Sequence, residues 1–178
     1  MGLDDFYREK KMIVFRKKFE VQSDGLHPTF HDVTKQVKEI VDSSGVKEGV
    51  CTIYSHHTTC SVMIQECSHD RTYFNLEYLQ QDLCNIMERL IPSCRVEGQY
   101  MHPGPKHIDF AMNEAKEVGE WTSLNTDAHL RSVLFGRSET IVIEDGKLDL
   151  GEFGYTYFVD WDQIRARKRE VQVVVMGN

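Results

Sequence analysis

Three histidines stand where the chain has the right residue types and surroundings for chemistry. His57 lies in a hydroxyl-rich turn, His102 precedes two prolines, and His129 falls in the first turn of an expected helix. Neutral imidazole is a good zinc ligand, and catalytic zinc sites often combine three protein ligands with one open position. We predict that these histidines form a metal site, with Zn²⁺ as the first choice of divalent ion. Spacing alone favours ordinary surface or half-buried histidines, because the chain has no HxH or HExxH motif.

Two carboxylates are candidates to assist these histidines. Glu66 ends the apolar stretch that begins at Cys60, and Asp127 precedes His129 by two positions. A carboxylate orients a ligating histidine or acts as a general base. If the protein is an enzyme, we expect Glu66, Asp127 and His129 to be its catalytic residues. The alternative for Asp127 is an acidic residue in the first turn of a helix, where the helix dipole favours it.

Hydroxyl and guanidinium groups near the histidines are the expected substrate contacts. We predict that Thr58, Thr59 and Arg131 bind a small anionic or phosphorylated ligand. The alternative for the threonines is that they bond the backbone, as hydroxyls at strand ends often do. The basic run Arg165–Arg169 leads into an expected strand and is interpreted as a solvated face.

Length and composition indicate one cytoplasmic domain. The 178 residues fit a single domain, which we place at 12–178 after a polar tail at 1–11. The net charge of −7 argues against a general nucleic-acid binder. No apolar run approaches the roughly 20 residues of a membrane span. The five cysteines are odd in number and lack a CxxC pair, which indicates reduced thiols and a cytoplasmic location.

Hydrophobic periodicity predicts an α+β fold. Apolar residues at three- and four-residue spacing predict helices from Thr29–Asp32 to Gly45, from about Thr72 to Leu90, and from Asn125 to Gly136. We expect Leu130, Val133 and Leu134 of the last helix to face inward. Strand patterns cover 12–21, 49–56, 60–65, 140–143, 147–150, 154–159 and 170–176. These strands cluster instead of alternating regularly with helices, which favours a mainly antiparallel layer fold.

Two further segments carry specific predictions, one about a turn and one about the mouth of the pocket. The Asp145-Gly146 pair predicts a type I′ hairpin turn. Residues 103–123 begin after His102 and end before the expected helix of His129, so we predict that they cover the pocket mouth, with Phe110 and Trp121 over a bound ligand. The alternative is a simple surface excursion.

Three blocks carry a resemblance to a known family. HHTTCSVMIQE (56–66), TDAHLRSVLFGRS (126–138) and DGKLDLGEF (145–153) resemble the YjbQ-like family, over roughly 50–177. The resemblance places the characteristic histidines of the family at His57, His102 and His129. It implies a two-layer α+β sandwich and a homotrimer. It also implies a weak secondary thiamine-phosphate synthase activity in some members, with a non-catalytic small-molecule or metal-binding trimer as the alternative.

The chain departs from the family pattern in several places. It has Gln65-Glu66 where Asn-Glu is usual, and Gly151–Gly154 reads Gly-Glu-Phe-Gly where Gly-Thr-Trp-Gln is usual. The segment between His102 and His129 is longer than usual, as is the stretch 70–80. These differences touch the expected substrate and leave the three histidines unchanged. The Val-rich strand at 170–176 independently favours a partner subunit, since a small sheet with two apolar faces must cover both.

Overall fold

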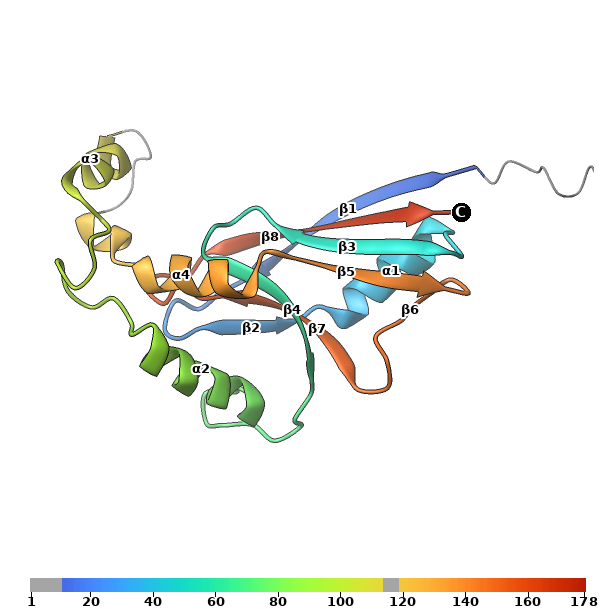
Figure 1. Ribbon diagram of the computed structural model, residues 1–178, viewed down its shortest axis with the longest axis horizontal. Helices are drawn as coiled ribbons and strands as arrows, with labels where there is room; N and C mark the ends of the chain where they lie inside the picture. Colours follow the sequence, from blue (N-terminus) through green and yellow to red (C-terminus); the bar gives the residue numbers. More distant parts are fainter. Residues whose placement is uncertain (1–10, 114–118) are drawn as a thin grey trace, which may run out of the picture.

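The computed structural model describes residues 11–113 and 119–178, and shows eight strands among them (Figure 1). The strands are β1 (Ile13–Gln22), β2 (Thr29–Asp32), β3 (Gly49–Ser55), β4 (Cys60–Glu66), β5 (Ser138–Glu144), β6 (Lys147–Leu148), β7 (Gly154–Asp160) and β8 (Lys168–Gly177). The helices are α1 (Thr34–Ser44), α2 (Tyr78–Leu90), α3 (Pro105–Asn113), the 3₁₀ helix η2 (Glu120–Ser123) and α4 (Thr126–Phe135).

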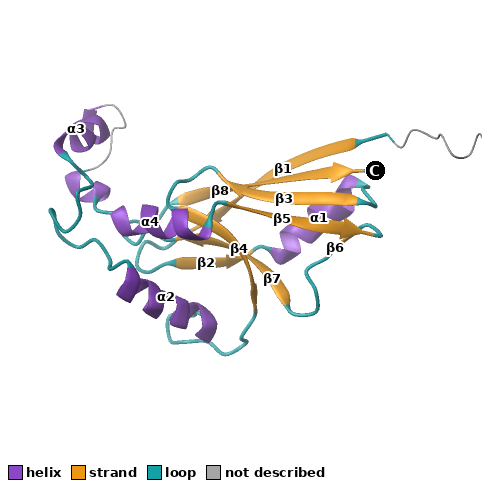
Figure 2. Cartoon of the chain, in the orientation of Figure 1, coloured by secondary structure: helices purple, strands orange, loops and turns teal. Residues whose placement is uncertain are grey.

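The strands form two antiparallel sheets. A five-stranded sheet has the order β1-β8-β3-β5-β6, and a three-stranded sheet has the order β2-β7-β4. Helix α1 lies beneath the larger sheet, while α2, α3 and α4 gather at the opposite end of the molecule (Figure 2). This arrangement confirms the predicted α+β sandwich of mainly antiparallel sheet with helices.

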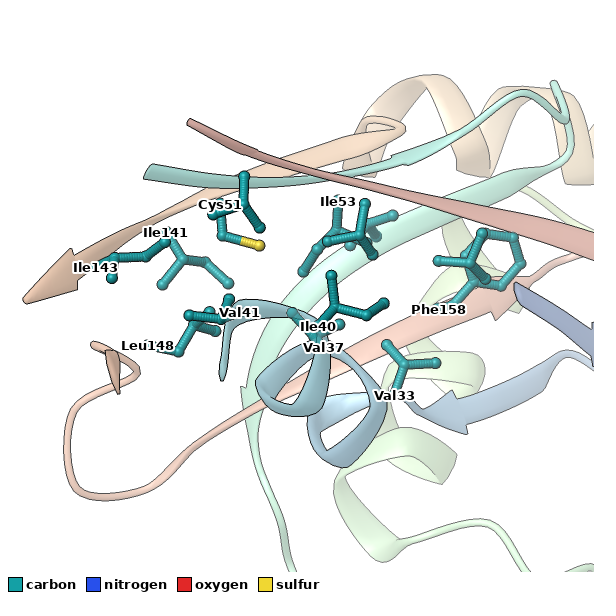
Figure 3. Close-up of a cluster of buried hydrophobic side chains, with 14 of the residues drawn as sticks. Val33, Val37, Ile40, Val41, Cys51, Ile53, Ile141, Ile143, Leu148 and Phe158 are labelled. Carbon is teal, nitrogen blue, oxygen red and sulfur yellow. The ribbon is translucent and has the colours of Figure 1, made fainter. Parts of the chain in front are cut away.

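The first hydrophobic core lies between the five-stranded sheet and α1. Val37 and Val41 of α1 point toward Cys51 and Ile53 of β3 and Ile141 of β5 (Figure 3). Alternate residues of β3, β5 and β8 are buried, as expected for strands with one covered face. The opposite face of this sheet is the more exposed one.

The second core lies between the three-stranded sheet and the helices α2 and α4. It contains Met87 of α2, Ala128 of α4, and Tyr157 and Val159 of β7. Phe158, the residue between these two, belongs to the first core. Since neighbouring strand residues point to opposite faces, β7 is buried on both sides and separates the two cores.

The hairpin between β5 and β6 has the predicted turn. Asp145 and Gly146 have φ values of 51° and 78°. A type I′ turn needs positive φ at both central residues, which Asp-Gly adopts readily. The Ile143↔Leu148 pairing continues the ladder beyond the turn.

Two expectations about the helices are wrong. Thr29–Asp32 does not open α1 but forms β2, which pairs with β7 through Phe30↔Val159. In α4, Leu130, Val133 and Leu134 are exposed by 44%, 80% and 56%, so they do not face inward. The buried face of α4 is largely polar. From this face, Ser132 Oγ donates a hydrogen bond to the Cys60 carbonyl at 2.7 Å. Helix α4 therefore docks on β4 partly through hydrogen bonds.

Part of the expected domain organisation lies outside the described residues. The predicted polar tail falls almost wholly on residues 1–10, which are not described. Among the described residues, no helix has both the length and the hydrophobicity that a bilayer span requires.

Candidate functional site

A cavity of about 320 Å³ lies where the turn after β3, the start of β8, α3 and the N-terminal end of α4 meet. Most of its lining side chains carry imidazole, hydroxyl, amide or guanidinium groups. They are His56, His57, Thr58, Thr59, His107, Phe110, Ala111, Ser123, Asn125, His129, Arg167 and Arg169. Two of the three predicted histidines thus line one cavity.

The turn between β3 and β4 is held by local hydrogen bonds. Ser55 Oγ accepts a hydrogen bond from the His57 N–H at 3.1 Å, and the Cys60 N–H donates to the His57 carbonyl at 3.2 Å. The Trp161 N–H donates to the Thr59 carbonyl at 3.0 Å. These bonds present Thr58 and Thr59 to the cavity, so both predicted hydroxyls are at the site.

His57 has one ring nitrogen already occupied. Its Nε2 accepts a hydrogen bond from the Glu170 N–H at 2.9 Å, so its Nδ1 is the nitrogen left for a ligand. Burial and then the positive charge of Arg169 lower the pKa of His57. The adjacent His56 also lines the cavity, and its Nε2 lies 2.6 Å from Gln172 Oε1. Because its pKa is lowered and its Nε2 accepts a hydrogen bond, His57 is neutral near pH 7.

His102 and His129 are brought together by the start of α4. Thr126 Oγ1 donates a hydrogen bond to the His102 carbonyl at 2.6 Å, and the two imidazole ring centroids are 5.8 Å apart. On its other side, the His102 ring lies 4.4 Å from that of His107 in α3. Burial lowers the pKa of both His102 and His129, and neighbouring imidazoles add to this effect. A row of three rings thus runs from α4 to α3.

The histidines as placed do not form a metal site. Among residues 11–113 and 119–178, no three His, Cys, Asp or Glu side chains are arranged to hold one metal ion. The Nε2 of His57 is committed to the Glu170 backbone. One feature agrees with a ligand: His102 Nε2 is buried and has no hydrogen-bond partner among the described residues.

A buried ion pair supports the floor of the cavity. Arg169 Nε and Nη2 donate to the two carboxylate oxygens of Asp160 at 2.6 and 3.0 Å, and Nη2 also donates to Thr59 Oγ1 at 3.1 Å. Asp162 lies 3.6 Å from the same guanidinium. Such bidentate pairs are geometrically specific, so Arg169 fixes Thr59 at the cavity.

Glu66 is not brought to the cavity. It is exposed at the far end of β4, opposite Gly154 of β7. Six residue-to-residue steps along β4 lead from Cys60 to Glu66, which corresponds to about 20 Å. The structure therefore gives no support for Glu66 as a base at this site.

Asp127 and Arg131 belong to a different network. Asp127 Oδ1 accepts a hydrogen bond from the Cys94 N–H at 3.2 Å. Neither Asp127 nor Arg131 lines the cavity. Burial raises the pKa of the Asp127 carboxyl, against the opposing effect of the Cys94 N–H. Arg131 is 1% exposed and donates to the Ile91 carbonyl at 2.7 Å and to Glu88 at 3.0 Å. Arg131 thus joins α4 to the end of α2 and does not face the cavity.

Several residues of the site were not identified from the sequence, among them His107 and Arg169. His107 had no motif, although it lies five residues after His102. Arg169 belongs to the basic run that was interpreted as a solvated face, and it is 3% exposed. The available signal for Arg169 was its place at the start of an alternating strand, where it falls on the same face as Val171, Val173 and Val175.

The fold and the cavity define a two-sheet α+β protein with a histidine-lined site at the ends of β3 and β8. The family described as UPF0047 protein YjbQ-like matches residues 17–178. The chain belongs to this YjbQ-like family.

Individual relatives agree with this assignment. A UPF0047 protein of Methanothermobacter thermautotrophicus is 30% identical over 142 residues, which cover 80% of each chain. A YbjQ-like protein of unknown function from Sulfolobus solfataricus superposes with a TM-score of 0.70 at 23% identity, covering 94% of this chain and 100% of that one. A crystal structure of an uncharacterised YjbQ/UPF0047 protein from Clostridium acetobutylicum superposes with a TM-score of 0.65 at 28% identity. The match covers 89% of this chain and 98% of that one.

Proposed function

We propose that this protein binds a small phosphorylated or otherwise anionic ligand in the histidine-lined cavity. The carrying observation is the donor-rich lining: the chain has a net charge of −7, yet no aspartate or glutamate is among the described residues that line the cavity. Arg167, Arg169 and four histidines line it instead, and the two guanidinium groups are paired from behind with Asp162 and Asp160. Clustered donors of this kind favour an anion.

The ligand contacts follow from the positions of the donors. Thr58 and Thr59 offer hydroxyl and backbone groups, and Asn125 offers an amide from the N-terminal end of α4. The macrodipole of α4 adds a positive partial charge at that end. Direct titration of the protein with inorganic phosphate or sulfate tests the proposal, and the absence of saturable binding would refute it.

A more specific version of this proposal is that the same cavity catalyses a reaction. Thiamine-phosphate synthesis, which the family resemblance suggests, joins a pyrimidine diphosphate to a thiazole phosphate. Both substrates are anionic, which agrees with an acid-free cavity. With Glu66 and Asp127 elsewhere, the four imidazoles that line the cavity, those of His57 and His129 among them, are the groups able to move a proton. We expect at most slow turnover.

A zinc site remains a second candidate. It is supported by the buried, unpartnered Nε2 of His102, which lies beside the rings of His107 and His129. Rotation of these rings would be required for three nitrogens to share one ion. Elemental analysis of protein purified without chelator or added metal tests this candidate, and less than a stoichiometric amount of metal would count against it.

We also propose a homotrimer, for which the open face of the five-stranded sheet is the expected contact. Val14, Met176, Val50 and Val142 lie opposite one another across β1, β8, β3 and β5. Three of these are substantially exposed, with Val142 at 57%. An apolar row of this width is typical of an interaction surface.

Val142→Lys is expected to dissociate the proposed trimer. The new charge would lie at the β5 end of the apolar row, where association would have to desolvate it. Light scattering should return a trimer mass for the parent protein and a smaller mass for the variant. Lys35→Glu, on the exposed surface of α1, is the matched control and should keep the parent mass. A monomeric parent at micromolar concentration would contradict the proposal.

Anion affinity is expected to rise as the pH falls. Burial lowers the pKa of His129, and a bound anion would raise it, so binding takes up a proton at this imidazole. His57 can donate from Nδ1 without taking up a proton, because its Nε2 accepts the Glu170 N–H. We expect sulfate affinity to increase by about fivefold between about pH 7.5 and about pH 6, and to level off once His129 is protonated. Sulfate keeps a constant charge over this range, so titration of the probe does not contribute.

Several charged groups set the size of this effect. Arg169 and His56 lower the pKa of His57, whereas Asp160 and Glu170 raise it. His107 and Arg167 lower the pKa of His129, whereas Asp162 raises it. Affinity that is independent of pH would show that His129 does not take up a proton when the anion binds.

A further inference from the structure

We infer that α3 makes the cavity selective for phosphorylated ligands that carry a planar aromatic ring. This inference rests on the proposed function, because it concerns the part of the ligand that extends away from the anion.

Helix α3 presents two rings and a small residue to the cavity. His107, Phe110 and Ala111 line the cavity, and their spacing of three and four places them on one helix face. The His107 and Phe110 ring centroids are 6.5 Å apart, with the ring planes tilted by 47°. Phe110 is nevertheless 56% exposed. A largely exposed phenylalanine on a cavity wall is a surface for an apolar ligand group.

The position of this wall is fixed relative to the anion site. The His107 ring contacts that of His102, which contacts that of His129, with centroid distances of 4.4 and 5.8 Å. The His102 carbonyl is held by Thr126 at the start of α4. Phe110 is therefore tied, through two imidazoles, to the helix that supplies His129 and Asn125.

The two sides of the cavity differ in chemistry. The residues outside α3 include the hydroxyl groups of Thr58 and Thr59 and the guanidinium of Arg169, whereas α3 contributes the Phe110 ring and the Ala111 methyl group beside the His107 imidazole. A ligand with an anionic group at one end and a flat ring at the other satisfies both sides. Aromatic rings prefer tilted or offset partners at these separations, which His107 and Phe110 together provide.

The test compares three probes on the intact protein by calorimetry: inorganic phosphate, phenyl phosphate and cyclohexyl phosphate. We expect phenyl phosphate to bind about tenfold more tightly than inorganic phosphate, with cyclohexyl phosphate between them. Phe110→Ala should reduce phenyl phosphate affinity about fivefold and leave inorganic phosphate affinity unchanged. Phe110→Tyr should retain the preference.

The control is Phe153→Ala, which removes a similarly exposed phenylalanine outside the cavity. It should change the affinity for none of the probes. Phosphate binding without a preference for phenyl phosphate, or a preference that survives Phe110→Ala, would overturn the inference and leave the proposed function intact. Equal affinity for the cyclohexyl and phenyl esters would overturn the aromatic requirement. Absence of binding by all three probes would refute the proposed function itself.

Discussion

Asp160→Asn is expected to lower the free energy of unfolding by about 3 kcal/mol. The substitution keeps the side-chain volume but removes the charge that balances Arg169, which is buried and bonded to Asp160 through two of its nitrogens. A buried guanidinium without its main counter-ion is costly, and Asp162 at 3.6 Å offsets only part of the loss. Urea denaturation followed by circular dichroism measures the change.

Asp42→Asn is the matched control, because this aspartate is exposed on α1 and outside the ion pair. We expect its stability to stay within about 0.5 kcal/mol of the parent. A loss below about 1 kcal/mol for Asp160→Asn would mean that the pair is far more hydrated than its burial indicates. Disruption of the pair is also expected to release Thr59, so anion affinity should fall with stability.

His129→Ala is expected to lower the affinity for inorganic phosphate by about thirtyfold near pH 6.5, since hydrogen bonds to charged groups contribute more than neutral ones. His129 lines the cavity, is half-buried, and has the neighbouring ring of His102 to orient it. Calorimetric titration measures the loss. His57→Ala should weaken binding as well, and each variant should abolish any slow turnover while the assembly survives.

His69→Ala is the control for this prediction, because His69 is exposed beyond the far end of β4 and does not line the cavity. Its affinity should equal that of the parent. Unchanged binding in His129→Ala would show that the anion binds elsewhere. Loss of binding together with loss of the oligomer would instead indicate that the histidines have a structural role between subunits.

The sequence determined the elements whose signals are local. Asp145-Gly146 has a backbone preference that selects its turn regardless of distant contacts. Runs rich in β-branched residues predicted β3 and β8 as strands, and clustered strands indicated antiparallel pairing. Three blocks of motif sufficed to identify the YjbQ-like family and, with it, the likeness of the fold to solved structures.

Burial and distance were decided only by the tertiary structure. Apolar spacing in α4 predicted that Leu130 and Val133 face inward, but hydrogen bonding to β4 turns a polar face toward the protein. Such compensation is invisible to hydrophobic periodicity, which assumes that the apolar face is the covered one.

The tertiary structure also decided which residues reach the site. Glu66 follows the His57 turn closely in sequence, yet an extended strand carries it about 20 Å away. His107 carries no motif and reaches the cavity because α3 is held against His102. Arg169 lies in a basic run but is buried, because Asp160 on the neighbouring segment neutralises it. Charge pairing between the end of β7 and the start of β8 depends on how the connecting segment packs, and no local sequence pattern records it.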